Sequence, residues 1–289
     1  MWFWYAFAAA LISGVSVVFN KRILNRGVHS SVVSFFLFFS CTIGGLFFLI
    51  QNGTKGADYI FFIAAGASAL VFSVGKTLQL NIFKQNNLSE IYPLASLSPL
   101  ILYLLGLITL NESIKITALT GLVLMIAGVY LVNYKSENKD LLHPLKHLFK
   151  HRSSLLYIFA MVLSSISAIA EKVAINHMID DSIFYLAFWE NFFLSFLMGT
   201  YVIKTNKNWL NEIKTHIVSL IIAGLLFTTL YFLVLTGFKE GPVALVSAIK
   251  KLEVLVVLLL SNIFFMERPS RYVYIGAFLM LIAVALIKI

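Results

Sequence analysis

Apolar residues dominate the chain in runs of about twenty, separated by short polar segments. Such a run can cross a hydrocarbon core of ~30 Å as a helix, whereas barrel strands would alternate polar and apolar residues over ~10 positions. The pattern therefore predicts an all-α membrane protein with ten transmembrane helices. Their expected ranges are residues 2–20, 30–50, 58–83, 88–110, 116–134, 154–176, 182–203, 215–238, 242–265 and 270–288.

The ten spans are expected to form two repeats of five, residues 1–134 and 154–289, joined by a polar connecting loop at 135–153. Sliding the chain by 155 residues places Glu112 on Glu267 and Phe83-Lys84 on Phe238-Lys239. Because five is odd, the two repeats must cross the membrane in opposite directions. Inverted repeats of this kind are typical of secondary transporters.

Composition excludes an ordinary soluble domain, because 60% of the residues are hydrophobic and only 12% are charged, against ~45–50% and ~25% in soluble proteins. The net charge of +9 does not indicate a nucleic-acid partner, since the basic residues lie in short interhelical loops. Most of them follow odd-numbered spans, which predicts that these loops are cytoplasmic and that both termini are extracytoplasmic. We expect a prokaryotic cell (inner) membrane, with the lipid bilayer around a monomer or homodimer.

Three charged residues, Lys250, Lys251 and Glu253, lie inside the predicted ninth span. A charge at the centre of a bilayer costs roughly 2.5–3.5 kcal/mol on insertion scales, so these residues indicate a solute or ion site within the bundle. The alternative is structural: Lys250 and Glu253 are three residues apart and could neutralise each other on one helix face. That pairing would leave Lys251 without a counter-charge.

Charged and aromatic candidates also occur in two other spans. Glu190 lies near the middle of the seventh span, where apolar surroundings favour a neutral carboxyl group and make it a candidate proton carrier. It could instead pair with Lys76 or with a lysine of the ninth span. Lys76, in the third span, could line a cavity or extend to the interface. Trp189 could stack on the substrate or face lipid.

Three further residues complete the set of candidates. Tyr92 precedes Pro93 in the fourth span, where proline can bend the helix and free carbonyl groups toward a cavity. Ser247 opens the segment SAIKKLE that carries the two lysines. Glu171, near the end of the sixth span, is expected to have a structural role by pairing with a neighbouring basic loop.

The repeated arrangement of a span ending in glutamate, followed by a glycine-containing span, occurs at Glu112/Gly121 and again at Glu267/Gly276. It resembles the EamA family of the drug/metabolite transporter superfamily, and the resemblance implies ten helices in two inverted repeats over essentially the whole chain. SAIKKLE also resembles the ninth helix of the superfamily's eukaryotic branches, where a basic doublet meets a phosphate or nucleotide. Glu253 departs from that pattern. Family members often have cytoplasmic termini, which opposes the charge distribution here.

The expected function is that of a secondary transporter of small organic metabolites: amino acids or related anionic or zwitterionic solutes, exported by alternating access. Exchange of phosphorylated or nucleotide-linked solutes and multidrug export are the alternatives. A membrane-embedded enzyme or scaffold is the alternative from another class. The sequence has no phosphate-binding glycine loop, HExxH or CxxC motif, so we expect no catalytic residues, cofactor or metal. Coupling to a proton through Glu190 or Glu253 is open.

Overall fold

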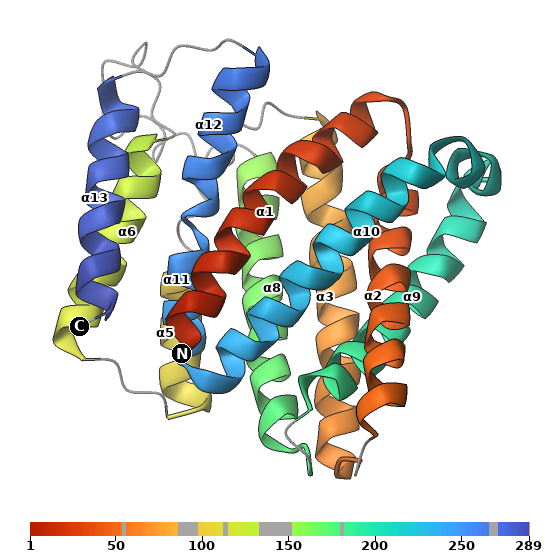
Figure 1. Ribbon diagram of the computed structural model, residues 1–289, viewed down its shortest axis with the longest axis horizontal. Helices are drawn as coiled ribbons and strands as arrows, with labels where there is room; N and C mark the ends of the chain where they lie inside the picture. Colours follow the sequence, from red (N-terminus) through yellow and green to blue (C-terminus); the bar gives the residue numbers. More distant parts are fainter. Residues whose placement is uncertain are drawn as a thin grey trace.

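Helices make up almost all of the computed structural model (Figure 1), which describes residues 1–53, 56–85, 98–111, 115–132, 152–179, 182–265 and 271–288. The helices are α1 (Trp2–Asn25), α2 (Ser30–Asn52), α3 (Tyr59–Gln85), α5 (Ser98–Thr109), α6 (Ile116–Val132), α8 (Arg152–Asn176), α9 (Ile183–Thr205), α10 (Trp209–Glu240), α11 (Val243–Lys250), α12 (Glu253–Phe265) and α13 (Arg271–Lys288). Within the described ranges, α1, α2, α3, α8, α9 and α10 are long and apolar enough to cross a membrane.

The observed helices confirm the predicted all-α membrane fold but differ from several of the expected ranges, among them those of the eighth and fourth spans. The eighth span was expected to begin at residue 215, but α10 begins at Trp209 and is kinked at His216, which has non-helical backbone angles. The predicted limit therefore marks a bend inside the helix. Of the fourth span, residues 98–109 form α5, and residues 88–97 lie outside the described part of the chain.

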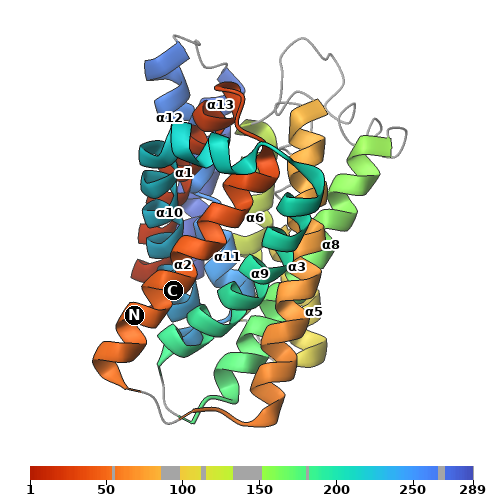
Figure 2. The ribbon, with the colours of Figure 1, turned by 90° about the vertical axis from the view of Figure 1, so that its right-hand side faces the viewer.

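Helix packing follows a two-fold pattern between the first and second halves of the chain. α1 packs along α10 as α3 packs along α8, and α2 packs on α10 as α9 packs on α3. The remaining large contacts pair equivalent helices, α2 with α9 and α6 with α13, and both pairs lie side by side in Figures 1 and 2. These large contacts of one repeat thus have counterparts in the other, as is expected of two inverted repeats.

Glycines allow some of these helix pairs to approach closely. A Cβ atom on Gly128 of α6 would lie 2.8 Å from the carbonyl oxygen of Gly276 on α13, and one on Gly121 would lie 2.9 Å from that of Ala283. On α2, a Cβ on Gly45 would lie 2.8 Å from the backbone nitrogen of Phe188. Small residues have this role in membrane helix interfaces, because apolar side chains gain little by leaving lipid.

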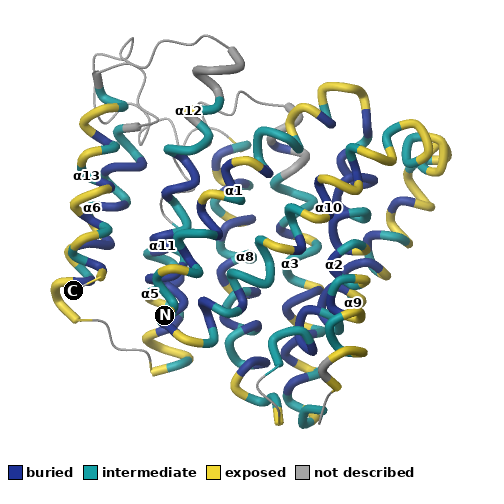
Figure 3. The backbone as a smooth tube through the Cα atoms, in the orientation of Figure 1, coloured by how far each residue is buried: buried dark blue, intermediate teal, exposed yellow. Residues whose placement is uncertain are grey.

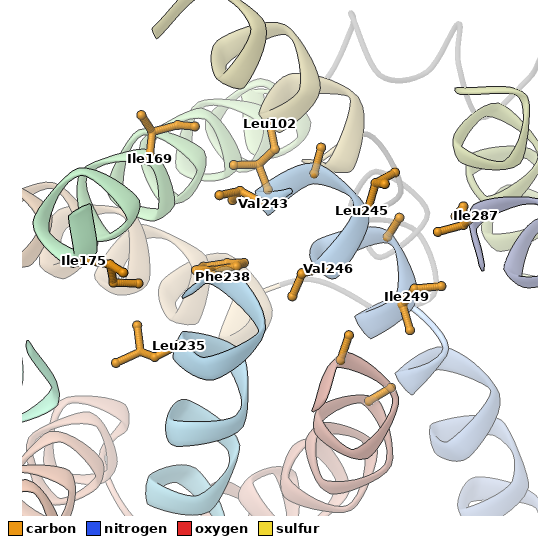
Figure 4. Close-up of a cluster of buried hydrophobic side chains, with 14 of the residues drawn as sticks. Leu102, Ile169, Ile175, Leu235, Phe238, Val243, Leu245, Val246, Ile249 and Ile287 are labelled. Carbon is orange, nitrogen blue, oxygen red and sulfur yellow. The ribbon is translucent and has the colours of Figure 1, made fainter. Parts of the chain in front are cut away.

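Apolar side chains occupy both the interior and the outer surface. Exposed positions lie mainly on the outer faces of the helices in Figure 3. Large apolar side chains are among the exposed residues, including Ile50, Ile108 and Val218. This distribution suits a bundle surrounded by hydrocarbon. In the interior, Figure 4 shows Val243, Val246 and other apolar side chains around α11, and these belong to one buried cluster that also includes residues of α1, α5, α8 and α10. The short helix α11 is therefore at the centre of the bundle.

Candidate functional site

The ninth predicted span is interrupted in its middle, between α11 and α12 (Figure 1). The backbone nitrogens of Lys251 and Leu252 bond to carbonyls three residues back, at 3.0 Å each, and those of Val254 and Leu255 do so at 3.1 and 3.0 Å. This is the tighter 3₁₀ geometry, which within a helix often marks a hinge. No glycine or proline occurs between Lys250 and Glu253, so the sequence lacked the usual signal for a break.

Glu253 begins α12 at this break and is held from two sides. The Ser13 hydroxyl of α1 donates a hydrogen bond to the Glu253 carboxylate, and Lys251 Nζ lies 3.9 Å from its other oxygen. α1 approaches so closely here that a Cβ on Gly14 would lie 2.5 Å from Val256 Cβ and 3.0 Å from the Glu253 carbonyl oxygen. Lys251, which the alternative pairing of Lys250 with Glu253 would have left without a counter-charge, is thus the lysine that lies at ion-pair distance from Glu253.

Lys76 reaches the same region from α3. Its ammonium group donates to Gln79 Oε1 at 3.3 Å, and the hydroxyl of the buried Tyr157 on α8 interacts with the Gln79 side chain. Lys76 also lies within electrostatic range of Lys250 and Glu253. The structure therefore brings together Lys76, Lys250, Lys251 and Glu253, which we call the lysine cluster.

Glu190 on α9 is 1% exposed and is bound by hydroxyl groups of two other helices. Ser68 Oγ of α3 donates to Glu190 Oε1 at 2.5 Å, and the Tyr231 hydroxyl of α10 donates to Oε2 at 2.5 Å. A second hydroxyl, Ser167 Oγ of α8, lies 2.8 Å from Ser68 Oγ. Among the described residues, hydroxyl groups thus bond to both oxygens of Glu190, and its pairing with Lys76 or with a lysine of the ninth span stays a prediction.

Glu171 on α8 is the residue whose role the sequence interpretation missed. It is 7% exposed, and its carboxyl group lies within hydrogen-bonding reach of Glu190. Lys250 acts on it electrostatically. Its expected structural pairing with a neighbouring basic loop stays a prediction. A clue was its position in the apolar segment AIAEKVAIN, but only the packing of α8 against α9 and α3 brings it to Glu190.

Three predicted site residues remain: Trp189, Ser247 and Tyr92. Trp189 is half-buried among aromatic rings, with centroids 5.3 Å from Phe62, 5.3 Å from Phe188 and 5.9 Å from Phe193. Ser247 is half-buried on α11, one turn before Lys251. Tyr92 lies outside the described residues. Whether these three contact a substrate stays a prediction.

Two charged groups of residues thus meet around α11, in the middle of the bundle. The lysine cluster holds three ammonium groups and one carboxylate, while Glu171 and Glu190 form a carboxyl pair beside Lys250. Buried charges are retained in a membrane chiefly where they serve a pathway or a bound solute. With its excess of ammonium groups, the lysine cluster can attract an anion, and the carboxyl pair can hold protons.

Comparisons with known proteins agree with this architecture. A solved crystal structure, described without a function, superposes with a TM-score of 0.75 at 15% identity, covering 100% of this chain and 98% of the other. At that identity, the likeness shows the fold. No curated protein matches the chain. The model of the EamA-like transporter family matches residues 1–134 and again residues 152–289. The chain therefore belongs to the EamA-like transporter family and is a membrane transporter of small solutes.

Proposed function

We propose that the protein is a secondary transporter of small organic solutes that carry an anionic group, with amino acids and related metabolites as the leading class. The observation that carries this proposal is the lysine cluster, where Lys76, Lys250 and Lys251 meet with Glu253. Placing these charges inside a membrane is costly. A bound carboxylate would offset that cost by pairing with these three ammonium groups, for which the lysine cluster itself supplies one carboxylate, Glu253.

Lys250 is the ammonium group best placed to receive the substrate. Lys251 is engaged by Glu253, and Lys76 by Gln79. Lys250, the member of the lysine cluster at the end of α11, also lies within electrostatic range of Glu171. In a zwitterionic substrate, the carboxylate would face Lys250, and the amino group would face Glu253 or Glu190. The two carboxylates thus provide the balancing charge.

Alternating access is supported by the two-fold packing and by the break in the ninth span. Each repeat makes equivalent contacts with the other, so two arrangements of similar energy, open to opposite sides, are available to the bundle. The 3₁₀ turn at Lys251-Leu252 lies at the lysine cluster. A change in this turn upon substrate binding would alter the angle between α11 and α12 and so couple the site to the helix packing.

A second candidate is the exchange of phosphorylated or nucleotide-linked solutes. The adjacent Lys250 and Lys251, with Lys76 nearby, supply three ammonium groups that suit a phosphate dianion. Glu253 favours the first candidate, because it reduces the positive charge and repels a dianion more strongly than a carboxylate. For the first candidate, the proposed direction of transport is export.

Binding can be tested on the purified protein with a panel of amino acids, organic phosphates and nucleotide sugars. A ligand at 100 times its Kd stabilises the folded state by ~2.7 kcal/mol and should raise the melting temperature. Loss of one charged hydrogen bond, worth ~1.5–3 kcal/mol, should weaken binding by about tenfold or more in Lys250→Ala. Lys204→Ala, at an exposed position on α9, is the matched control.

Transport is then measured by counterflow in liposomes with each solute that shifts the melting temperature. Amino acids should exchange in the wild type and in Lys204→Ala, but not in Lys250→Ala/Lys251→Ala. Exchange of phosphorylated solutes alone would favour the second candidate. Full transport by the double variant would show that the lysine cluster is not the substrate site.

A further inference from the structure

The start of α10 is an amphipathic segment, residues 209–215, that differs from the long apolar remainder of the helix. It ends at the kink at His216, where φ is −115° and ψ is 19°. With 32 residues, α10 extends ~48 Å, whereas the hydrocarbon core is ~30 Å thick. Part of the helix is therefore expected at the membrane surface, and the polar sequence before the kink, WLNEIKTH, is the part that suits this position.

This segment is attached to the hairpin between α1 and α2, which belongs to the other repeat. The Glu212 carboxylate accepts hydrogen bonds from the His29 backbone nitrogen and from Asn206 Nδ2, at 2.8 Å each. The Trp209 ring meets Phe35 of α2 edge-on, with the ring centroids 6.2 Å apart. The amphipathic segment thus has a fixed place at this end of the bundle.

Three exposed cations, Arg26, Lys207 and Lys214, surround this contact, and we call them the basic corner. Arg26 Nη1 lies 3.5 Å from Ser219 Oγ, which brings the cation of the α1–α2 hairpin beside α10. Lys207 immediately precedes α10, and Lys214 lies within the amphipathic segment. Glu212, the acid of this segment, is half-buried, and both of its oxygens accept hydrogen bonds. The surface of the corner is therefore positively charged.

Exposed apolar side chains adjoin these cations. Leu210 is 54% exposed, and Val218, just beyond the kink, is 68% exposed. A phospholipid matches both features, because its phosphate pairs with cations at the membrane surface while its acyl chains cover apolar side chains. An acidic soluble protein would supply the charge but would leave these apolar residues uncovered. The neighbourhood of the cations thus favours a lipid as their partner.

We propose that the basic corner binds anionic phospholipids, with the lipid phosphate at the three cations and the acyl chains along Leu210 and Val218. In the orientation that the loop charges predict, the corner lies in the cytoplasmic leaflet, where anionic headgroups attract cations near a span. Because the α1–α2 hairpin and α10 belong to different repeats, one bound headgroup contacts both. The site is separate from the lysine cluster and needs no substrate.

Trp209 provides a local reporter of lipid binding in the full-length protein. In phosphatidylcholine bilayers, a rising fraction of the lipid is replaced by brominated phosphatidylglycerol, which quenches tryptophan fluorescence on contact. A parallel series uses brominated phosphatidylcholine. The contribution of Trp209 is the part of the signal that Trp209→Phe lacks. In the wild type, this part should be quenched at a severalfold lower fraction of phosphatidylglycerol than of phosphatidylcholine.

Charge removal tests whether the cations cause this preference. Each cation near a membrane surface should contribute about a fivefold preference for anionic lipid. The preference should therefore fall about fivefold in Lys214→Gln and further in Lys207→Gln/Lys214→Gln, neither of which alters the hydrogen bonds of Glu212. Lys115→Gln is the matched control and should keep the wild-type preference, since Lys115 is exposed and precedes α6, which begins at the other end of the bundle in Figure 1.

Two results would overturn this proposal. Equal quenching of Trp209 by the two lipids would show that the corner does not select anionic lipid, and would leave an acidic protein as the partner of its cations. An unchanged preference in Lys207→Gln/Lys214→Gln would place the selectivity elsewhere. Should that variant fold poorly, Arg26→Gln on the α1–α2 hairpin applies the same test, with the same fivefold loss expected.

Discussion

At the residue scale, charges inside this bundle are held by small and hydroxyl-bearing neighbours on other helices. Ser13 on α1 binds Glu253 on α12, Ser68 on α3 binds Glu190 on α9, and Tyr231 on α10 binds the same carboxylate. Hydroxyl groups donate to a carboxylate without adding charge. They therefore stabilise the buried acids without bringing in a further cation.

Ser13 and Gly14 together determine how α1 meets Glu253. Ser13→Ala should lower the stability of the protein by ~1.5–3 kcal/mol, since it leaves a buried carboxylate without its donor. Gly14→Ala should cost about 1–3 kcal/mol, because its Cβ would lie 2.5 Å from Val256 Cβ and force α1 away from α12. Thermal unfolding in detergent measures both.

The matched control for these two variants is Ser73→Ala on the exposed face of α3, where the hydroxyl bonds only to its own helix, at Leu70 O. Its melting temperature should stay at the wild-type value. A Ser13→Ala protein as stable as this control would show that the hydrogen bond to Glu253 contributes nothing to folding.

At the element scale, the segments between helices join the two repeats at both ends of the bundle. At one end, Asp58 before α3 lies 2.8 Å from His177 after α8, and Ala57 and Met178 form a β-bridge. At the opposite end in Figure 1, the His29 backbone nitrogen donates to Glu212 Oε2 of α10 at 2.8 Å. These two contacts are equivalent: each links the N-terminal end of the third helix of one repeat to the first hairpin of the other.

The joint between Asp58 and His177 should make stability depend on pH. The hydrogen bond from His177 holds the pKa of Asp58 below its ordinary value of 3.8. Its contribution is therefore complete above pH ~4 and is lost as the pH falls through the lower folded-state pKa. Asp58→Asn should melt slightly below the wild type at pH 7, and the difference should vanish in acid.

A double-mutant cycle with His177→Asn isolates this contact from other effects of the substitutions. The two single variants should not be additive at pH 7, because each breaks the same hydrogen bond. Additive effects at pH 7, or a difference that persists in acid, would contradict the assignment of the stability to this pair.

At the scale of the whole molecule, an odd number of spans in each repeat gives the bundle its two-fold packing and places corresponding loops on opposite faces. The distribution of Lys and Arg predicts an orientation in which the loops after odd-numbered spans are cytoplasmic and both termini lie outside. Family resemblance argues for the reverse. The two orientations place the contact between Asp58 and His177 in opposite compartments. The orientation therefore determines whether cytoplasmic or extracytoplasmic pH affects this contact.

Single cysteines at the two ends of the bundle can settle the orientation. A membrane-impermeant maleimide applied to intact cells should label Gln51→Cys, at the end of α2, and should label Lys207→Cys, between α9 and α10, only after permeabilisation. Both positions are exposed, and the native Cys41 is buried and should stay unlabelled. Labelling of Lys207→Cys alone in intact cells would reverse the assignment.

Much of the fold follows from local pattern. Runs of apolar residues predict spans because each backbone polar group must be satisfied within its own helix in lipid, and the limits of α2, α6 and α13 lie within two residues of those expected. The sequence also identifies site candidates in Lys250, Lys251 and Glu253, because a charged residue inside an apolar span is costly whichever helices surround that span.

Tertiary structure alone decided how those charges are partnered. Glu171 and Glu190 are nineteen positions apart on different helices, and neither sequence neighbourhood shows that their carboxyl groups meet or that Ser68 and Tyr231 complete the pair. The helix break at Lys251-Leu252 could not be predicted either, because no glycine or proline occurs there. The physical reason is the distance along the chain over which each interaction acts. Helix formation and membrane insertion depend on residues a few positions apart, whereas a buried charge is stabilised by polar groups that other helices place within ~3 Å of it.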